Sequence, residues 1–243
     1  MNSESLFLSR QESCLMLADD RRLGHPKPQH FEPRWWQGAG RVIGEAKGRG
    51  SAWFLNIDTE QWVLRHYRRG GMVSRWVEDT YLYTGAERSR PFRELRLLRA
   101  MEARGLPVPA PVGACLSRQG LLYRADLISV RVPGQPLSKR LMEGDSDPGL
   151  FRRVGEVIGR FHAEGIFHAD LNAHNILVEG ECVHLIDFDR SQWRRPGHWQ
   201  RRNLERLQRS VKKILASDWA EEAQWQQAWL ALEQGWRDVI KKG

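Results

Sequence analysis

The most informative segment of the chain is His168-Ala-Asp-Leu-Asn-Ala-His-Asn-Ile-Leu-Val-Glu-Gly-Glu-Cys-Val-His-Leu-Ile-Asp-Phe-Asp189. Within it, the apolar runs 176–178 and 182–186 flank a short polar segment that contains glycine. Two such runs around a turn predict a tight β-hairpin. Antiparallel strands bring the residue before the first strand next to the residue after the second. We therefore expect Asn175 and Asp187 to lie side by side.

Polar side chains at the ends of this hairpin have the chemistry of a phosphoryl-transfer site. The amide oxygen of Asn175 and the carboxylate of Asp187 form a hard oxygen pair that suits Mg²⁺, whose other ligands are usually water and nucleotide phosphates. Asp170 precedes the hairpin, where its carboxylate can accept a proton from an attacking hydroxyl. The stretch therefore predicts a metal and nucleotide held in line with a nucleophile.

Composition limits the class of protein. The 243 residues are enough for one core or for two lobes, and the net charge of +8 calls for an anionic partner. Nucleic acid, nucleotide phosphates and acidic lipid all qualify by charge. The arginines are scattered among acidic residues without a nucleic-acid recognition motif, so we expect no nucleic-acid partner.

The sequence also predicts a cytoplasmic protein. No uninterrupted apolar run approaches the roughly 18 residues of a membrane-spanning helix, and the first ten residues lack a signal pattern. The cysteines, at positions 14, 115 and 182, are far apart and without CxxC spacing. Neither a disulfide framework nor a zinc site is indicated.

The first half of the chain is rich in predicted strands. Residues 1–40 are expected to be an irregular extension, because proline and glycine interrupt any helix there. Short strands are predicted at 41–44, 52–57, 62–67, 121–123 and 127–130. Between them, a helix is expected from Pro91 to a stop at Gly105, with Phe92, Leu95, Leu98 and Met101 at helical spacing.

The second half is predicted to be mainly helical. Asp147 before Pro148 is typical of a capped helix start, and Gly165 marks that helix's end. Further apolar stripes are Leu204, Leu207, Val211 and Ile214, and then, after a cap at Asp218, Trp225, Trp229, Leu232 and Trp236. Strands first and helices afterwards predict an α+β fold. The expected divisions are the extension 1–40, a sheet-rich lobe 41–132 and a helical lobe 133–243.

The opening stretch resembles the protein-kinase family. His168 to Asn175 is similar to the catalytic-loop pattern H-x-D-x-x-x-x-N, and Asp187-Phe-Asp189 stands where kinases have D-F-G. The resemblance implies a bilobal kinase-like fold with ATP and Mg²⁺ as cofactors. It makes Asp170 the catalytic carboxylate, His168 a brace of the catalytic loop, and Asn175 and Asp187 the metal ligands.

Upstream residues extend this resemblance. Gly48 and Gly50 lie between two predicted strands, either in a phosphate-binding glycine-rich loop or in an ordinary hairpin loop. Arg65 occupies the position of the kinase lysine, and its planar fork differs from an ammonium group. Glu94 is the preferred carboxylate partner of Arg65, with Glu87 and Glu102 as alternatives.

The chain departs from protein kinases in ways that favour a smaller acceptor. Asp189 replaces the D-F-G glycine, which makes a flipping activation switch less favourable. No A-P-E sequence follows, and about 50 residues remain, too few for the full helical lobe of a protein kinase. A small-molecule or lipid-sugar acceptor is therefore expected.

Several stretches resemble the lipopolysaccharide-core kinases, particularly their 3-deoxy-D-manno-octulosonic acid (Kdo) kinase branch. They are residues 62–71, 93–98, 105–109, 186–190 and the catalytic loop. The resemblance implies ATP-dependent phosphorylation of the 4-hydroxyl of Kdo on a lipid A precursor. It also implies a peripheral protein on the cytoplasmic face of a Gram-negative inner membrane, with an anionic membrane surface as partner.

Other interpretations remain open at this point. A heptose kinase of the same pathway and an aminoglycoside-type phosphotransferase share the catalytic loop, and Arg65 is the feature that favours a non-catalytic pseudokinase scaffold. The basic cluster Arg65, His66, Arg68 and Arg69 either meets lipid A phosphates or is a solvated face. Trp35, Trp36 and the C-terminal tryptophans either rest at a lipid interface or pack in the core.

Overall fold

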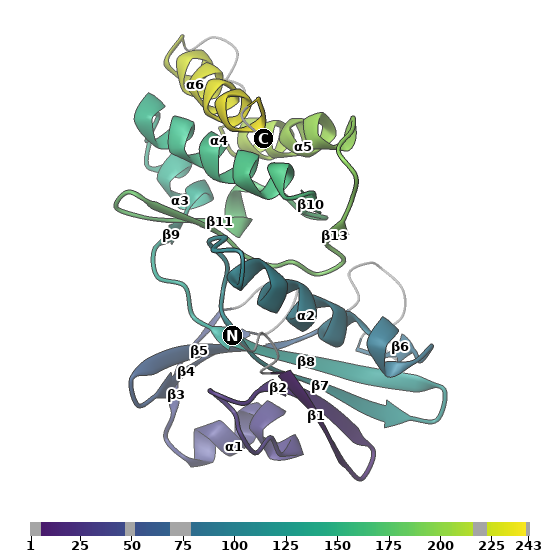
Figure 1. Ribbon diagram of the computed structural model, residues 1–243. Helices are drawn as coiled ribbons and strands as arrows, with labels where there is room; N and C mark the ends of the chain where they lie inside the picture. Colours follow the sequence, from purple (N-terminus) through teal and green to yellow (C-terminus); the bar gives the residue numbers. More distant parts are fainter. Residues whose placement is uncertain (1–5, 47–51, 69–78, 216–222, 242–243) are drawn as a thin grey trace. The chain divides into compact units, whose positions relative to one another are not determined.

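The computed structural model describes residues 6–46, 52–68, 79–215 and 223–241 (Figure 1). The chain divides into two compact units. The first unit contains residues 1–103 and 109–131, and the second contains 104–108 and 132–243. The predicted lobe boundary, between 132 and 133, lies one residue beyond this division. The predicted extension 1–40 falls within the first unit.

The first unit is built on one antiparallel sheet, with strand order β1-β2-β7-β8-β5-β4-β3 and β6 paired to β8 among the described residues (Figure 1). Its strands are β1 Leu6–Gln11, β2 Cys14–Asp19, β3 Val42–Ala46, β4 Ala52–Ile57, β5 Glu60–His66, β6 Tyr81–Leu82, β7 Pro111–Gln119 and β8 Leu122–Val130. The predicted strands at 41–44, 52–57 and 62–67 thus form β3, β4 and β5.

The prediction that the first 40 residues are irregular is wrong. β1 and β2 form a hairpin, and β2 pairs with β7 from Cys14 to Ala18. The physical reason is burial, because Met16 and Ala18 are fully enclosed in the core of the sheet. A 3-10 turn η1 (Pro28–Phe31) and a short helix α1 (Pro33–Gly38) follow, and Trp36 packs in the same apolar cluster.

Strands β7 and β8 also differ from the predicted strands. The runs predicted as two strands at 121–123 and 127–130 belong to one strand, β8, apart from Leu121, which lies in the turn. Its partner β7 was not predicted. Pro111 stands at the first residue of β7, a place where proline is tolerated, and the next residues are buried through Leu116.

Helix α2 (Arg90–Glu102) follows a short 3-10 turn, η2 (Ala86–Arg88), and packs against β7 and β8. It matches the helix expected from Pro91. Ser89 is the N-cap position, and Phe92, Leu95, Leu98 and Met101 are buried as their spacing predicted. Gly105 adopts φ of +66°, the left-handed conformation that glycine supplies after a helix end.

The second unit contains four helices and two small sheets among its described residues. The helices are α3 Leu137–Met142, α4 Pro148–Ala163, α5 Trp199–Leu215 and α6 Ala223–Ile240. The strands are β9 Gln135–Pro136, β10 Ile166–Phe167, β11 Ile176–Glu179, β12 Cys182–Leu185 and β13 Gln192–Trp193. They pair in the orders β12-β11-β9 and β10-β13, and a 3-10 turn, η3, spans Ala173–Asn175.

The predicted start of α4 is confirmed. The Asp147 carboxylate accepts hydrogen bonds from the backbone N–H groups of Gly149 and Leu150, at 3.0 and 2.9 Å. These bonds lower the pKa of Asp147. The predicted cap at Asp218 lies outside the described residues, although the final helix it was expected to open is present as α6.

Helices α4 and α6 pack closely, and glycines make this possible. A Cβ atom on Gly155 would lie 2.0 Å from the Leu232 carbonyl oxygen, and one on Gly235 would lie 2.3 Å from the Arg152 carbonyl oxygen. The backbones of α4 and α6 therefore approach each other more closely than a residue larger than glycine would allow at these positions. Across the described ranges, no helix is both long and apolar enough to cross a bilayer.

Candidate active site

The opening stretch folds as the predicted hairpin, in a register that corrects one detail. Ile176 in β11 pairs with Leu185 in β12, and the Ile186 N–H donates to the Asn175 carbonyl at 3.0 Å. The residue opposite Asn175 is therefore Ile186, and Asp187 follows one position later. The prediction of directly paired side chains is off by one residue, because it took the second strand one residue too long.

A left-handed backbone turn directs the chain at Asp187. Its φ is +62°, an uncommon value for a residue with a side chain. Phe188 is fully buried, with its ring 5.7 Å from Phe161 and 4.7 Å from His168 between centroids. The strained turn thus lies at Asp187, two residues before the Asp189 that replaces the kinase glycine.

His168 holds the catalytic loop against the hairpin. Its Nδ1 accepts a hydrogen bond from the Asp170 N–H at 3.2 Å, so its Nε2 donates to the Ile186 carbonyl at 3.0 Å. The side chain is 2% exposed, and burial lowers its pKa. A neutral, enclosed imidazole of this kind positions the loop without contacting an acceptor.

Two asparagine amides fix the backbone of Asp170. Asn172 and Asn175 each donate from Nδ2 to the Asp170 carbonyl, at 2.9 and 3.0 Å. The Asn172 Oδ1 in turn accepts from the N–H groups of His174 and Asn175. Because the nitrogen of the Asn175 amide is engaged, its oxygen is the atom that can serve as a ligand.

Helix α5 supplies contacts to this loop that the sequence analysis missed. Asn203 donates to the His168 carbonyl at 2.8 Å, and the Ser210 hydroxyl accepts from the Ala173 N–H at 3.2 Å. Between them, Arg206 forms an ion pair from Nη2 to Oδ1 of Asp170. The sequence signal for these contacts was the presence of polar Asn203 and Ser210 beside the apolar stripe of this helix. In the structure Asn203 is buried.

In the first unit, Arg65 and Glu94 come together. Arg65 Nη2 lies 2.5 Å from Glu94 Oε1 and donates to the Tyr67 hydroxyl at 3.3 Å. Tyr67 donates to the other oxygen of Glu94, whose side chain is 3% exposed. The two alternative carboxylates pair elsewhere, Glu87 with Arg96 and Glu102 with Arg99. Gly48 and Gly50 lie outside the described residues.

The basic cluster around Arg65 is partly neutralised within its own unit. His66 Nδ1 lies 2.7 Å from Asp126 Oδ1, and this hydrogen bond raises the pKa of His66. Arg69 lies outside the described residues. Among the tryptophans, Trp36, Trp225 and Trp229 are buried, which favours core packing for these three, whereas Trp35 is 36% exposed.

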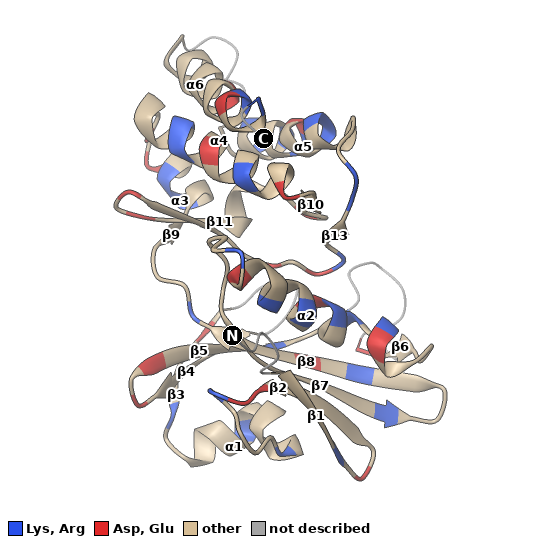
Figure 2. Cartoon of the chain, viewed as in Figure 1, with Lys and Arg blue, Asp and Glu red and all other residues tan. Residues whose placement is uncertain are grey.

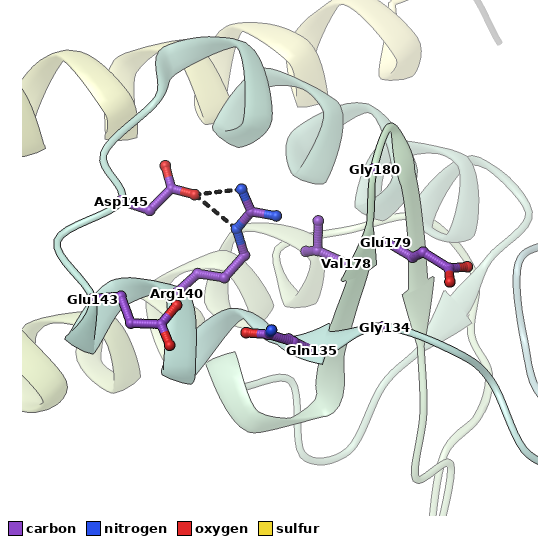
Figure 3. Close-up of a pocket in the computed structure, with 8 residues that line it drawn as sticks. All are labelled: Gly134, Gln135, Arg140, Glu143, Asp145, Val178, Glu179 and Gly180. Carbon is purple, nitrogen blue, oxygen red and sulfur yellow. Dashed lines mark hydrogen bonds and ion pairs between the residues drawn. The ribbon is translucent and has the colours of Figure 1, made fainter.

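A hollow of about 400 Å³ opens elsewhere in the second unit, beside β9, α3 and the turn between β11 and β12 (Figure 3). The Arg140–Asp145 ion pair, at 2.6 Å, lies within it. Its lining residues are Gly134, Gln135, Arg140, Glu143, Asp145, Val178, Glu179 and Gly180. None of the residues predicted for catalysis or metal binding lines it.

The donor set near the hairpin suits a metal that keeps non-protein ligands. Within the described residues, no three His, Cys, Asp or Glu side chains gather as a metal site. An amide oxygen and one carboxylate are what Mg²⁺ commonly takes from a protein when substrate phosphates and water complete its shell. Asn175 and Asp187 therefore fit Mg²⁺ bound with a nucleotide better than a metal held by protein ligands alone.

Comparisons with known proteins identify the family of this chain. The family described as "Lipopolysaccharide kinase (Kdo/WaaP) family" matches residues 33–232. A "3-deoxy-D-manno-octulosonic acid kinase" of Xylella fastidiosa (strain 9a5c) is 45% identical over 211 residues, covering 86% of this chain and 84% of that protein. The protein of the same name from Vibrio parahaemolyticus serotype O3:K6 (strain RIMD 2210633) is 39% identical over 208 residues, covering 85% and 87%.

Solved structures show the fold. "WaaP in complex with acyl carrier protein" aligns with a TM-score of 0.50 at 16% identity, covering 86% of this chain and 96% of that one. The bifunctional kinase-methyltransferase WbdD aligns with a TM-score of 0.50 at 15% identity, covering 82% and 47%. The predicted α+β, kinase-like fold is confirmed.

Proposed function

Because this chain belongs to the lipopolysaccharide kinase (Kdo/WaaP) family and is a phosphotransferase of lipopolysaccharide core biosynthesis, we propose that it phosphorylates the 4-hydroxyl of Kdo on a Kdo-lipid A precursor. ATP is the phosphoryl donor. The observation that carries the proposal is the catalytic loop, in which an exposed Asp170 carboxylate stands on a backbone held by His168, Asn172 and Asn175.

In this reaction the acceptor oxygen attacks the γ-phosphorus of ATP, and the bond from that phosphorus to the β,γ-bridging oxygen breaks. ADP leaves with the bond's electron pair. Asp170 accepts the proton of the acceptor hydroxyl and later releases it to solvent. Most of the acceleration comes from position and charge, since the loop's hydrogen bonds keep the carboxylate in place before the acceptor arrives.

Asn175 and Asp187 would hold Mg²⁺, which neutralises phosphate charge when bound. Arg65 would orient the phosphates of ATP, with Glu94 and Tyr67 fixing its guanidinium. The glycines at 48 and 50 are proposed to cover the phosphates with backbone N–H groups. His168 acts through the loop as a positioning residue.

We also propose that the protein works peripherally on the cytoplasmic face of the inner membrane. Leu121 and Leu122 at the tip of the β7–β8 hairpin are 74% and 38% exposed, and Leu82 on β6 beside them is 60% exposed. Arg118 and Arg124 stand on the two strands of that hairpin. Apolar side chains flanked by cations suit an anionic lipid surface.

One acceptor panel tests the proposed reaction. The purified protein is incubated with ATP, Mg²⁺ and, separately, Kdo-lipid A precursor, heptosylated lipid and an aminoglycoside, and the products are located by fragmentation mass spectrometry. Phosphate on the 4-hydroxyl of Kdo is expected. Phosphate only on heptose or on the aminoglycoside would reject it in favour of those acceptors.

Asp170→Asn is the catalytic control in the same panel. Loss of the proton acceptor should lower the rate by about 10² to 10⁴ while leaving the fold intact. Glu164→Gln, which alters an exposed pair with Arg104 in the same unit, should retain the wild-type rate. Equal product from wild type and Asp170→Asn with every acceptor would favour a pseudokinase scaffold.

A further inference from the structure

Helix α5 presents a line of cations that begins beside the catalytic loop and continues along the helix. At about 100° per residue, four exposed basic side chains fall within an arc of about 60°. They are Arg202, Arg206, Arg209 and Lys213, which we call the α5 basic stripe. Lys and Arg along α5 are drawn in blue in Figure 2. The positions of Asn203 and Ser210, which hold the catalytic loop, lie on the adjoining arc.

The stripe differs from its surroundings in its charge balance. Within the described ranges, Arg202, Arg209 and Lys213 have no ion pair, and Arg206 pairs with the catalytic Asp170. Arg201, one residue away but on a different side of the helix, pairs with Glu205 and with Glu233 at 3.0 Å. Positive charge is therefore left uncompensated on the side of the helix that carries Arg206, the residue paired with Asp170.

The pair between Arg206 and Asp170 can exchange partners. Their side chains are 47% and 49% exposed, and ion pairs exposed to this degree contribute little net stability. A guanidinium also has five N–H donors in a planar fork that matches a carboxylate. Arg206 can therefore bind a carboxylate of the acceptor while remaining next to Asp170.

The chemistry of the acceptor supplies such a carboxylate. Kdo is a sugar acid whose carboxylate is attached to ring carbon 2, separated from carbon 4 by a single methylene. A 4-hydroxyl within hydrogen-bond distance of Asp170 thus brings the acid group within reach of the side chain already paired with Asp170. Neutral sugars and aminoglycosides offer no group of this kind.

We propose that Arg206 binds the carboxylate of the acceptor sugar and so selects a sugar acid, with the rest of the α5 basic stripe attracting the phosphates of the glycolipid. This inference rests on the proposed function, since it names the acceptor group read at the same site. Arg206 is a substrate-binding residue in this scheme, and Asp170 remains the proton acceptor.

The test compares two acceptors and four proteins. The acceptors are Kdo-lipid A precursor and its carboxamide, in which the acid is neutral but similar in shape. Wild type should prefer the acid by about 10- to 100-fold in kcat/KM, as expected for a hydrogen bond to a charged group. Arg206→Gln should be weak with both acceptors and show no preference, because the charge that distinguishes them is gone.

Two further variants sharpen the assignment. Arg209→Gln should weaken binding of acid and carboxamide equally, because it lies on the stripe but away from Asp170. Arg201→Gln, the same change on another side of the same helix, should behave as wild type. If Arg206→Gln keeps the wild-type preference and only lowers kcat, Arg206 merely orients Asp170 and the proposal is overturned. Loss of the preference in Arg209→Gln would also overturn it.

Binding measured without ATP separates this proposal from the proposed function. Calorimetric titration of the same two acceptors reports the preference whether or not phosphate is transferred. A preference present in wild type and absent in Arg206→Gln supports the carboxylate contact even if no Kdo phosphate forms, which would reject only the proposed reaction. Equal binding of acid and carboxamide by wild type overturns the contact even if Kdo is phosphorylated.

Discussion

At the scale of single residues, Arg65 makes contacts with Glu94 and Tyr67 that depend on the shape of a guanidinium. One guanidinium nitrogen reaches both Glu94 and the Tyr67 hydroxyl, and the guanidinium carbon lies 4.9 Å from the centre of the Tyr67 ring. An ammonium group has no plane with which to stack on that ring. The carboxylate of Glu94 is buried, and Arg65 supplies a positive charge that balances it.

We predict that Arg65→Ala lowers the free energy of unfolding by on the order of 3 kcal/mol, because it removes a cation paired with a buried carboxylate. Adding Glu94→Gln should recover most of the loss by removing the charge of that carboxylate. Urea unfolding measures both variants. Arg96→Ala, which breaks an exposed pair with Glu87 on the same helix, should cost under about 1 kcal/mol. Equal losses for the two alanine variants would contradict this account.

His162 is a second residue whose environment has a measurable consequence. It accepts a hydrogen bond from the Trp236 indole at Nδ1, at 2.9 Å, and Nε2 faces Asn203 Oδ1 at 3.2 Å. Burial lowers the pKa of His162 from 6.5 to about 4. Between these values the unfolded chain binds a proton that the folded chain does not, so stability falls as pH falls.

We predict that this histidine accounts for about 2 kcal/mol of the stability lost between pH 7 and pH 5. The non-titrating variant His162→Gln should start less stable at pH 7, because it disturbs two hydrogen bonds, but should lose less on acidification. Denaturant unfolding at the two pH values gives the comparison. The same acid sensitivity in both proteins would show that other groups, such as buried His168, are responsible.

At the scale of elements, the contact between α4 and α6 depends on glycines that an isolated helix would disfavour. In a helix exposed to solvent, alanine at Gly155 would be stabilising. Here the added Cβ would meet the Leu232 carbonyl at 2.0 Å, and backbone cannot move aside as a flexible side chain can. The steric cost of the added Cβ at Gly155 therefore outweighs the higher helix propensity of alanine.

We predict that Gly155→Ala destabilises the protein by about 2 to 3 kcal/mol and lowers Tm by roughly 5 to 10 °C. Gly38→Ala is the matched control, because nothing lies within 4 Å of its added Cβ, and its effect should stay within about 0.5 kcal/mol. Calorimetry on both variants is sufficient. An unchanged or higher Tm for Gly155→Ala would show that the two helices separate easily.

Elements with strong local signals were predictable, and those that depend on distant partners were not. Helices α2, α4 and α6 show apolar residues at helical spacing, and β3, β4 and β5 are short apolar runs between turns. β7 was missed because it begins at Pro111, and β2 because its burial depends on pairing with β7 about 100 residues later. Hydrogen bonding across that separation leaves no periodic pattern in either segment.

At the scale of the whole molecule, the net charge of +8 and the exposed leucines support the proposed contact with a membrane. We predict binding to vesicles that contain an anionic phospholipid, weakened by salt, and little binding to neutral vesicles. The double variant Leu121→Ser, Leu122→Ser should reduce binding by about tenfold through lost apolar burial. Vesicle sedimentation measures this.

Leu230→Ser is the matched control, because this leucine is 59% exposed on α6, in the second unit rather than the first. It should leave vesicle binding unchanged. If both leucine changes at the hairpin tip leave binding intact while salt abolishes it, charge alone holds the protein at the surface.

From the amino-acid sequence alone came the kinase-like loop, the hairpin after it, and the proposed roles of Asp170, Asn175 and Asp187. These features are local, since a 22-residue stretch contains them and short-range turn and strand rules govern it. The tertiary structure decided what holds and surrounds that chemistry. Asn203, Arg206 and Ser210 reach the loop from 35 to 37 residues away. Such contacts arise only when helix packing brings α5 against the loop. The residue spacing within the loop or within α5 does not specify that packing.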